Sequence, residues 1–265
     1  MSLTFESEAE FEKQLVKVLS EHKGWTDGVL RYPTEEDLIA NWADILFQSN
    51  RGIDRLNGCP LTSTEMQQIL NQVNACKTPA ERNELINGRS ISIIRDNKDD
   101  SQNYGKTVSL AIYDREQIAG GKSRYQIAVQ PKFKAREKIF PKRRGDLMLL
   151  INGMPLIHIE LKRSGVDVSQ AIHQIEKYSF EGVFSQGIFS LVQLFVAMNP
   201  EETKYFANPG NENITDQGHF RQEFMFHWAD ENNIPQNDWA YIAEHLLSIP
   251  MAHKMIGFYT VADAG

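Results

Sequence analysis

The stretch from residue 146 to residue 162 constrains the fold of this chain more than any other. Two apolar runs, residues 147–151 and 156–161, lie on either side of the pair Asn152-Gly153. An Asn-Gly pair between two such runs is the strongest short-range signal of a β-hairpin, because both residues tolerate the left-handed backbone of a two-residue turn. The sequence therefore predicts two antiparallel strands joined by a tight turn.

The predicted hairpin brings three charged residues together at its open end. Asp146 directly precedes the first strand, and folding back about the turn places it opposite the neighbourhood of Glu160 and Lys162. Side chains two apart on a strand share a face, so Glu160 and Lys162 point the same way. A pair of carboxylates suits a hard divalent cation such as Mg²⁺. The lysine could orient or deprotonate a water molecule, or stabilise charge on a phosphate. The alternative is an ordinary exposed Glu–Lys pair.

Residues 7–22 are expected to form a helix that begins at a capping box headed by Ser7. Glu8 and Glu12 are one turn apart on one side of this helix, within or beside its apolar stripe. The helix dipole favours acids in the first turn, which accounts well for Glu8 and less well for Glu12. We therefore consider Glu12 a further metal ligand, direct or through water. A sugar- or nucleotide-binding enzyme that uses Glu8 or Glu12 is another interpretation, supported only by their position.

A basic run precedes the hairpin. Seven lysines or arginines and a single glutamate lie between residues 132 and 144. A solvated linker can have this composition, but the run leads directly into Asp146, where the backbone of a polyanion would lie beside a metal site. We therefore predict DNA contacts for Lys142, Arg143 and Arg144. The net charge of -7 argues against tight DNA binding by the chain alone.

A second candidate surface lies on the helix expected from about residue 168 to 180. Gln170, Gln174 and Tyr178 are spaced four apart and so share one face of that helix. This face directly follows the acidic hairpin in the sequence. It could steady the lysine, the attacking water or a DNA phosphate, with Gln170 as a DNA contact. The alternative is an exposed polar face.

The rest of the chain carries no complete chemical motif. Gly121-Lys122-Ser123 is only the end of a P-loop pattern and precedes a strand, so the sequence predicts no nucleotide-driven motor of its own. Cys59 and Cys76 form no zinc-ligand spacing and fit a reducing cytoplasm. The sequence contains no run of about 18 apolar residues, so it predicts no membrane span. Strands are expected at residues 91–95, 108–113, 125–130, 191–198, 205–207 and 224–228, and helices within 31–88 and at 239–247.

Four segments together resemble the N-terminal nuclease domain of the R (HsdR) subunit of type I restriction enzymes, a member of the PD-(D/E)xK superfamily. They are the strings Ile151–Lys162 and Gln174–Tyr178, the opening helix, and residues 194–208. The resemblance implies an α/β, restriction-endonuclease-like fold: a mixed β-sheet flanked by helices, with a helical insertion. We expect the nuclease domain over residues 1–250, the insertion over 31–88, and the start of a linker to a motor domain over 251–265. Gly145 departs from the family pattern, which has proline there.

The resemblance also implies roles for individual residues. Asp146 and Glu160 would hold Mg²⁺, Lys162 would position or activate the attacking water, and Gln174 and Tyr178 would support catalysis or DNA contact. Glu12 is a weaker correspondence. The chain would be the endonuclease module of a cytoplasmic restriction–modification complex that cuts double-stranded DNA. ATP would act only through helicase-like motor domains beyond this chain, and modification and specificity subunits would be its partners. The alternative is a non-catalytic, nuclease-like module that docks a motor or a specificity subunit.

Overall fold

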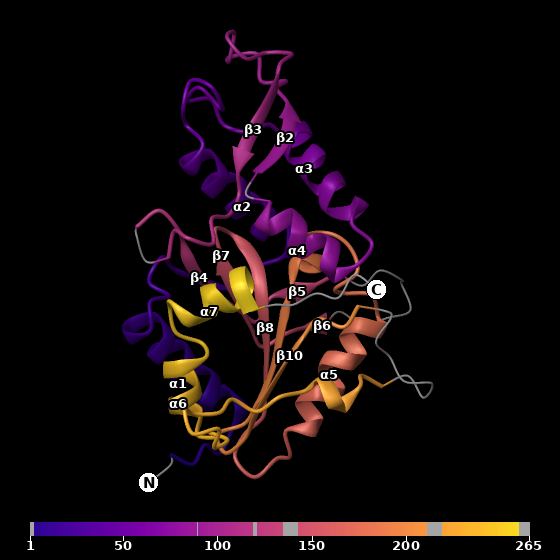
Figure 1. The fold of residues 1–265 in the computed structure, drawn as a ribbon. Coiled ribbons are helices and arrows are strands. Elements are labelled where there is room, and N and C mark those ends of the chain that lie inside the picture. The colour runs from indigo at the N-terminus through magenta and orange to yellow at the C-terminus, as the bar shows by residue number, and fades with distance from the viewer. Residues whose placement is uncertain (1–2, 89, 119–120, 135–142, 211–218, 260–265) are drawn as a thin grey trace.

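The computed structural model describes the chain except for residues 1–2, 89, 119–120, 135–142, 211–218 and 260–265. At the centre of the described part lies a six-stranded sheet in the order β1-β4-β7-β8-β9-β10 (Figure 1). The pairs β1–β4 and β8–β9 are parallel and the other neighbours are antiparallel, which confirms the expected mixed sheet. The strands are β1 (Val29–Arg31), β4 (Tyr125–Val129), β7 (Leu147–Ile151), β8 (Met154–Leu161), β9 (Leu194–Met198) and β10 (Thr203–Ala207).

The predicted hairpin forms the middle of this sheet. Asn152 and Gly153 have φ angles of 53° and 84°, as a two-residue hairpin turn between twisted strands requires. A register shift between Leu149 and Leu150 leaves one extra residue on β8, so that Leu147 pairs with Ile159 and Asp146 lies across from Glu160. Every residue of β7 and β8 is buried, because each strand has a neighbour on both edges and side chains packed on both faces.

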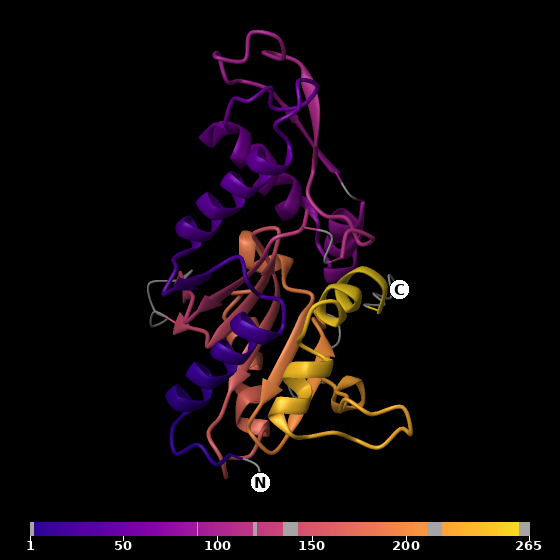
Figure 2. The same cartoon turned by 90° about the vertical axis from the view of Figure 1, so that its left-hand side faces the viewer.

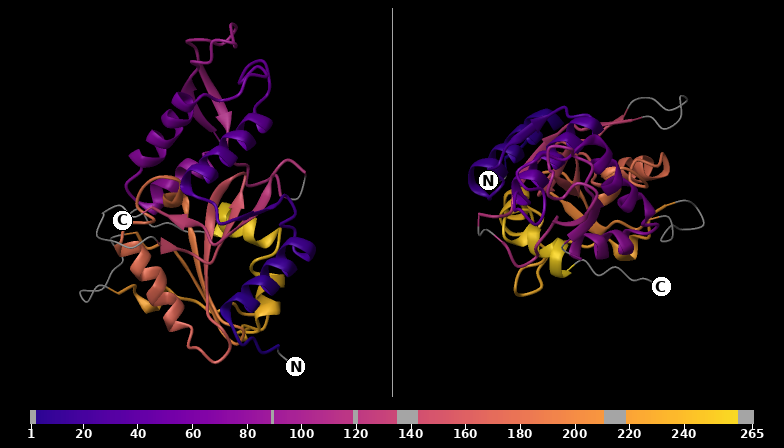
Figure 3. Two further views of the ribbon diagram at one scale, coloured as in Figure 1. Left: turned by 180° about the vertical axis from the view of Figure 1, so that it is seen from behind. Right: turned by 90° about the horizontal axis from the view of Figure 1, so that it is seen from above.

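Helices cover both faces of the sheet. On one side α1 (Glu8–His22) contacts β8 and α6 (Trp239–His245), and on the other α5 (Ser169–Phe180) contacts β8 and β9 (Figures 1 and 3). Buried apolar residues at helical spacing on α1 and α5 drive this packing. A short helix, α7 (Met251–Lys254), and a π-turn (Met255–Tyr259) follow, with Ala252 and Ile256 fully buried. The linker boundary at residue 251 stays a prediction.

A second group of elements lies beyond one end of the central sheet (Figure 2). The expected helices are present, and the first two begin at capping boxes headed by Thr34 and Thr62. The elements are α2 (Glu35–Ser49), α3 (Ser63–Ala75), α4 (Pro79–Asn87), β2 (Ser90–Ile94) and β3 (Thr107–Ala111). The strands β2 and β3 form a hairpin, and β2 packs against α3. Two short strands, β5 (Lys132–Phe133) and β6 (Arg143–Arg144), pair with each other outside the main sheet.

A buried ion cluster holds this second group together. The guanidinium of Arg95 lies 2.5 Å from the carboxylate of Glu65 and 3.0 Å from that of Asp100, and all three side chains are fully buried. Glu65 also accepts hydrogen bonds from the backbone of Thr62 and Asp96. Each buried charge therefore has partners, as burial of ionised groups requires.

The strand expected over residues 224–228 is wrong. Residues Gln222–Phe224 form a 3₁₀ turn, and within 224–228 only Phe226 pairs with a strand, through a single bridge to Tyr205 of β10. The side chains of Phe224 and Phe226 are each 51% exposed. The apolar run lies along the edge of the sheet with little burial to hold it in an extended register.

No helix in the described ranges combines the length and the apolar character needed to cross a lipid bilayer.

Candidate active site

Asp146 is fixed at the open end of the hairpin by hydrogen bonds of its side chain and its backbone. Its Oδ2 accepts a 2.8 Å hydrogen bond from the backbone N–H of Leu161. Its carbonyl accepts one of 2.7 Å from the N–H of Gln130. Because Leu161 lies between Glu160 and Lys162, this hydrogen bond holds the Asp146 side chain beside both of them.

Glu160 is a fully buried carboxylate near the end of β8, one of the two middle strands of the sheet. Neither of its oxygens accepts a hydrogen bond of standard geometry from a residue that the structure describes, and its polar neighbours include the backbone and the carboxyl group of Asp146, which lower its pKa only in part. Nε2 of His158 lies 3.2 Å from one oxygen but outside hydrogen-bond geometry. Burial lowers the pKa of His158 to about 4, so this ring carries no charge at neutral pH to offset that of the carboxylate.

The pKa values of Asp146 and Glu160 are both raised. For both groups the main cause is burial, and for Asp146 the negative charge of Glu160 adds to it. A buried carboxylate without donors needs either a proton or a cation, since leaving it bare costs much of its hydration energy. Oxygen ligands of this kind suit a hard divalent cation such as Mg²⁺ or Mn²⁺. The residues present therefore fit a divalent cation.

Lys162 is held by three acceptors. Its Nζ donates to the carbonyl of Leu161 at 2.9 Å and to Oε1 of Gln174 at 3.0 Å. Its third contact is an ion pair of 3.3 Å with Oε1 of Glu8. An ammonium group has three N–H donors, so these contacts account for all of them. The side chain is 9% exposed, so the lysine is a positioned cation in a largely buried setting.

Gln174 and Tyr178 form a relay from this lysine to the chain that enters the hairpin. Nε2 of Gln174 donates to the hydroxyl of Tyr178 at 2.7 Å, and that hydroxyl donates to the carbonyl of Arg144 at 2.8 Å. Burial raises the pKa of Tyr178, so the hydroxyl keeps its proton. Among the alternatives left open by the sequence, this geometry joins the polar face of α5 to the lysine. Gln170, on the same helix, is exposed.

Glu12 lies close to the carboxylate pair but has a different partner. Both of its oxygens accept hydrogen bonds from Nε2 of Gln130, at 3.1 and 3.0 Å. Burial raises the pKa of Glu12, and the charge of Asp146 raises it further. Its role as a metal ligand stays a prediction. Sequence reasoning missed Gln130, which carries no motif, and missed that Glu8 rather than Glu12 reaches Lys162.

The residues predicted to contact DNA are in different situations. Arg143 makes a bidentate pair with Glu181, with distances of 2.8 and 2.7 Å. Arg144 is exposed. Lys142 lies outside the described residues. The predicted DNA contacts of these residues and of Gln170 stay predictions.

The glycine at position 145, where the family pattern has proline, has a steric explanation. A β-carbon at this position would lie 2.7 Å from Cε1 of His158 and 2.9 Å from Cζ of Phe133. These distances are shorter than carbon–carbon contacts allow. The bulky ring of His158 on the neighbouring strand therefore leaves space for no side chain in front of Asp146.

Comparison with known proteins identifies related sequences. A family model described as "Type I restriction enzyme R protein N terminus" matches residues 5–214. The chain is 29% identical, over 98% of its length, to the endonuclease subunits of type I restriction enzymes SauMSSORF170P (Staphylococcus aureus, strain MSSA476) and SsaAORF53P (Staphylococcus saprophyticus), and covers 25% of each. It is also 41% identical over 91 residues to the type I restriction enzyme EcoprrI endonuclease subunit of Escherichia coli, a match of 34% of this chain and 28% of that protein. The chain thus spans about a quarter of the length of the curated relatives it matches along its whole length.

Proposed function

This chain belongs to the family of type I restriction enzyme R protein N termini, and we propose that it is a Mg²⁺-dependent endonuclease module that cleaves double-stranded DNA. Relatives along its whole length carry the name endonuclease subunit. The activity of such a protein, its partners and its use of ATP are part of the proposal, because the chain corresponds to about a quarter of those relatives.

The observation that carries the proposal is the buried carboxylate of Glu160, which accepts no hydrogen bond of standard geometry from a described residue and lies across the hairpin from Asp146. A protein retains such a group at a cost in stability, which argues for a functional use. Asp146 and Glu160 would hold Mg²⁺ between them. When bound, the ion would supply Lewis-acid stabilisation of the phosphate and a more acidic water molecule.

Lys162 would orient the attacking water or stabilise charge on the phosphate. Gln174 holds its ammonium group, and Tyr178 holds Gln174. Glu8 is the partner that can leave most easily, because its side chain is 48% exposed. We propose that a DNA phosphate or a water molecule takes the place of Glu8 at Nζ, which would turn the ammonium group toward the reacting centre without disturbing the relay.

We propose the surrounding assembly on the basis of the same family membership. DNA would approach along Lys142, Arg144 and Gln170, with Arg143 available only if it leaves Glu181. Motor domains in the remainder of the polypeptide would use ATP, and modification and specificity subunits would complete the complex in the cytoplasm.

The test is cleavage by the full-length R protein assembled with its partner subunits. Asp146→Ala, Glu160→Ala and Lys162→Ala should each abolish double-strand cleavage while ATP hydrolysis persists. Lys17→Ala, at an exposed position on α1, is the matched control and should cut normally. Normal cleavage by all three site variants would refute the assignment. Failure of the wild-type chain to bind Mn²⁺ through Asp146 and Glu160 would favour a docking module instead.

A further inference from the structure

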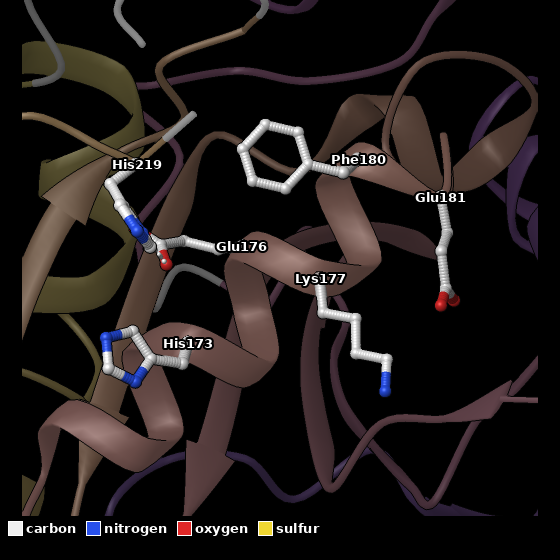
Figure 4. A pocket seen from close by; sticks show the side chains of 6 residues that line it. All are labelled: His173, Glu176, Lys177, Phe180, Glu181 and His219. Atoms are coloured by element: carbon white, nitrogen blue, oxygen red, sulfur yellow. Dashed lines mark hydrogen bonds and ion pairs between the residues drawn. The ribbon is translucent and has the colours of Figure 1, made fainter. Parts of the chain in front are cut away.

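A second group of metal-ligating side chains lies on α5, apart from the carboxylate pair. His173 and Glu176 are three residues apart on this helix, and His219 reaches them from a segment that lies beyond β10 in the sequence. One ligand atom of each lies within 4.8 Å of the others, and the three side chains point toward one another (Figure 4). We propose that His173, Glu176 and His219 bind a divalent transition-metal ion such as Zn²⁺.

Glu176 is the fixed ligand of this site. The residue is 5% exposed, and its Oε1 accepts a 2.8 Å hydrogen bond from the backbone N–H of Phe220. Its Oε2 lies 3.1 Å from Nδ1 of His219. Two ligands about 2.0–2.1 Å from a tetrahedral Zn²⁺ lie about 3.3–3.4 Å apart. A small shift therefore lets an ion replace the proton between these two atoms.

His173 is the adjustable ligand. It is exposed, and its ring centroid lies 6.0 Å from that of His219. A change of its side-chain rotamer can close the remaining gap, since the described residues leave the ring exposed. The group lines a hollow of about 410 Å³, which leaves room for water at a fourth position. Lys177 lines the same hollow but extends away from the three ligands (Figure 4).

The ligand types separate this site from the carboxylate pair. Imidazole nitrogens suit Zn²⁺, Co²⁺ and Ni²⁺, whereas Mg²⁺ prefers oxygen ligands and keeps much of its hydration shell. Two imidazoles and one carboxylate therefore select a transition metal even in an excess of Mg²⁺. The two sites would hold different ions in the same molecule.

A bound ion would join two distant parts of the chain. Gln174 and Tyr178 extend from α5 to Lys162 and Arg144, and the same helix would be fastened to residue 219. The metal would thus brace the helix that positions the lysine. The simpler interpretation is that Glu176 and His219 form an ion pair without metal. His173 distinguishes the two, because it has no part in that pair.

The test is calorimetric titration of the 265-residue chain with ZnCl₂ in an excess of Mg²⁺, with Co²⁺ absorption spectra as a second readout. We expect one Zn²⁺ per chain and a higher Tm in its presence. His173→Ala should weaken binding at least about tenfold, the lower end of what even outer-shell partners of a metal contribute. His22→Ala removes an exposed histidine that lies beside a glutamate on α1 and should leave binding unchanged.

Equal Zn²⁺ affinity in the wild type and in His173→Ala would overturn the proposal, as would the absence of Zn²⁺ binding. Zn²⁺ binding that is lost in Asp146→Asn but kept in His173→Ala would also overturn it, because the ion would then lie at the carboxylate pair. Since His173 is exposed, its variant should fold, and the outcome does not depend on the proposed nuclease activity.

Discussion

Replacement of Glu160 by glutamine should stabilise the metal-free chain while it abolishes metal binding. The buried carboxylate accepts no hydrogen bond of standard geometry from a described residue, and burial raises its pKa more than its contacts with Asp146 lower it. A glutamine has nearly the same shape and no charge. Its amide can donate to the carboxylate of Asp146, which lies across the hairpin.

The magnitude follows from the cost of an unsatisfied buried polar group, about 1–3 kcal/mol and more for a charged one. For a chain of this size 1 kcal/mol changes Tm by about 2–4 °C, so we expect a rise of about 2–12 °C. The gain should depend on pH. The folded-state pKa of Glu160 is raised above the unfolded-state value of about 4.3. The free energy of unfolding of the wild type is therefore highest below about pH 4.3, where this group is protonated in both states, and it falls as the pH rises through the folded-state pKa. The advantage of glutamine should therefore grow from acidic to alkaline pH.

The assay is thermal unfolding of the wild type and of Glu160→Gln in EDTA from acidic to alkaline pH, repeated with Mn²⁺. Mn²⁺ should raise the Tm of the wild type and leave that of Glu160→Gln unchanged. Glu65→Gln is the matched control, because this buried carboxylate does accept hydrogen bonds, from Arg95 and from the backbone of Thr62 and Asp96, and lies outside both metal sites. It should lower the Tm. A Glu160→Gln protein that is less stable than the wild type at alkaline pH without metal would refute the reasoning.

Three further predictions follow from the fold and the site. Arg95→Met should cost about 3–5 kcal/mol in urea unfolding because it leaves Glu65 and Asp100 buried without their cation; a loss below about 1 kcal/mol would contradict this. Gly153→Ala should cost more than Gly105→Ala in the same measurement. Both have a positive φ, but a β-carbon on Gly153 would lie 2.9 Å from Cα of Trp42, whereas one on Gly105 would meet nothing within 4 Å. Calorimetric Mn²⁺ affinity should rise from about pH 6 to about pH 8, since the raised pKa of Asp146 and of Glu160 makes protons compete with the ion; a pH-independent affinity would contradict the assignment of these ligands.

The sequence by itself determined the hairpin and the residues that meet at its end. The Asn152-Gly153 turn and the two-residue period of strands predict that Asp146, Glu160 and Lys162 come into one neighbourhood. The exact pairing of Asp146 with Glu160 depends on a register shift between Leu149 and Leu150, which no residue pattern in the sequence signalled. Gln174 and Tyr178 were likewise predictable as neighbours, because the helical period places them on one face of α5. These are relations within one element or across one tight turn, and apart from that register shift local backbone geometry suffices for them.

Only the tertiary structure decided which residues face one another from elements far apart in the sequence. The contact of Glu8 with Lys162 depends on how α1 packs against the sheet, and that of His219 with Glu176 on how the chain returns past α5. Arg143 is paired with Glu181 for the same reason. Burial of apolar faces sets these positions, and the polar contacts follow from it. A periodic pattern reports which face of an element is buried but not which neighbour covers it, so no local signal in the sequence specified these pairs.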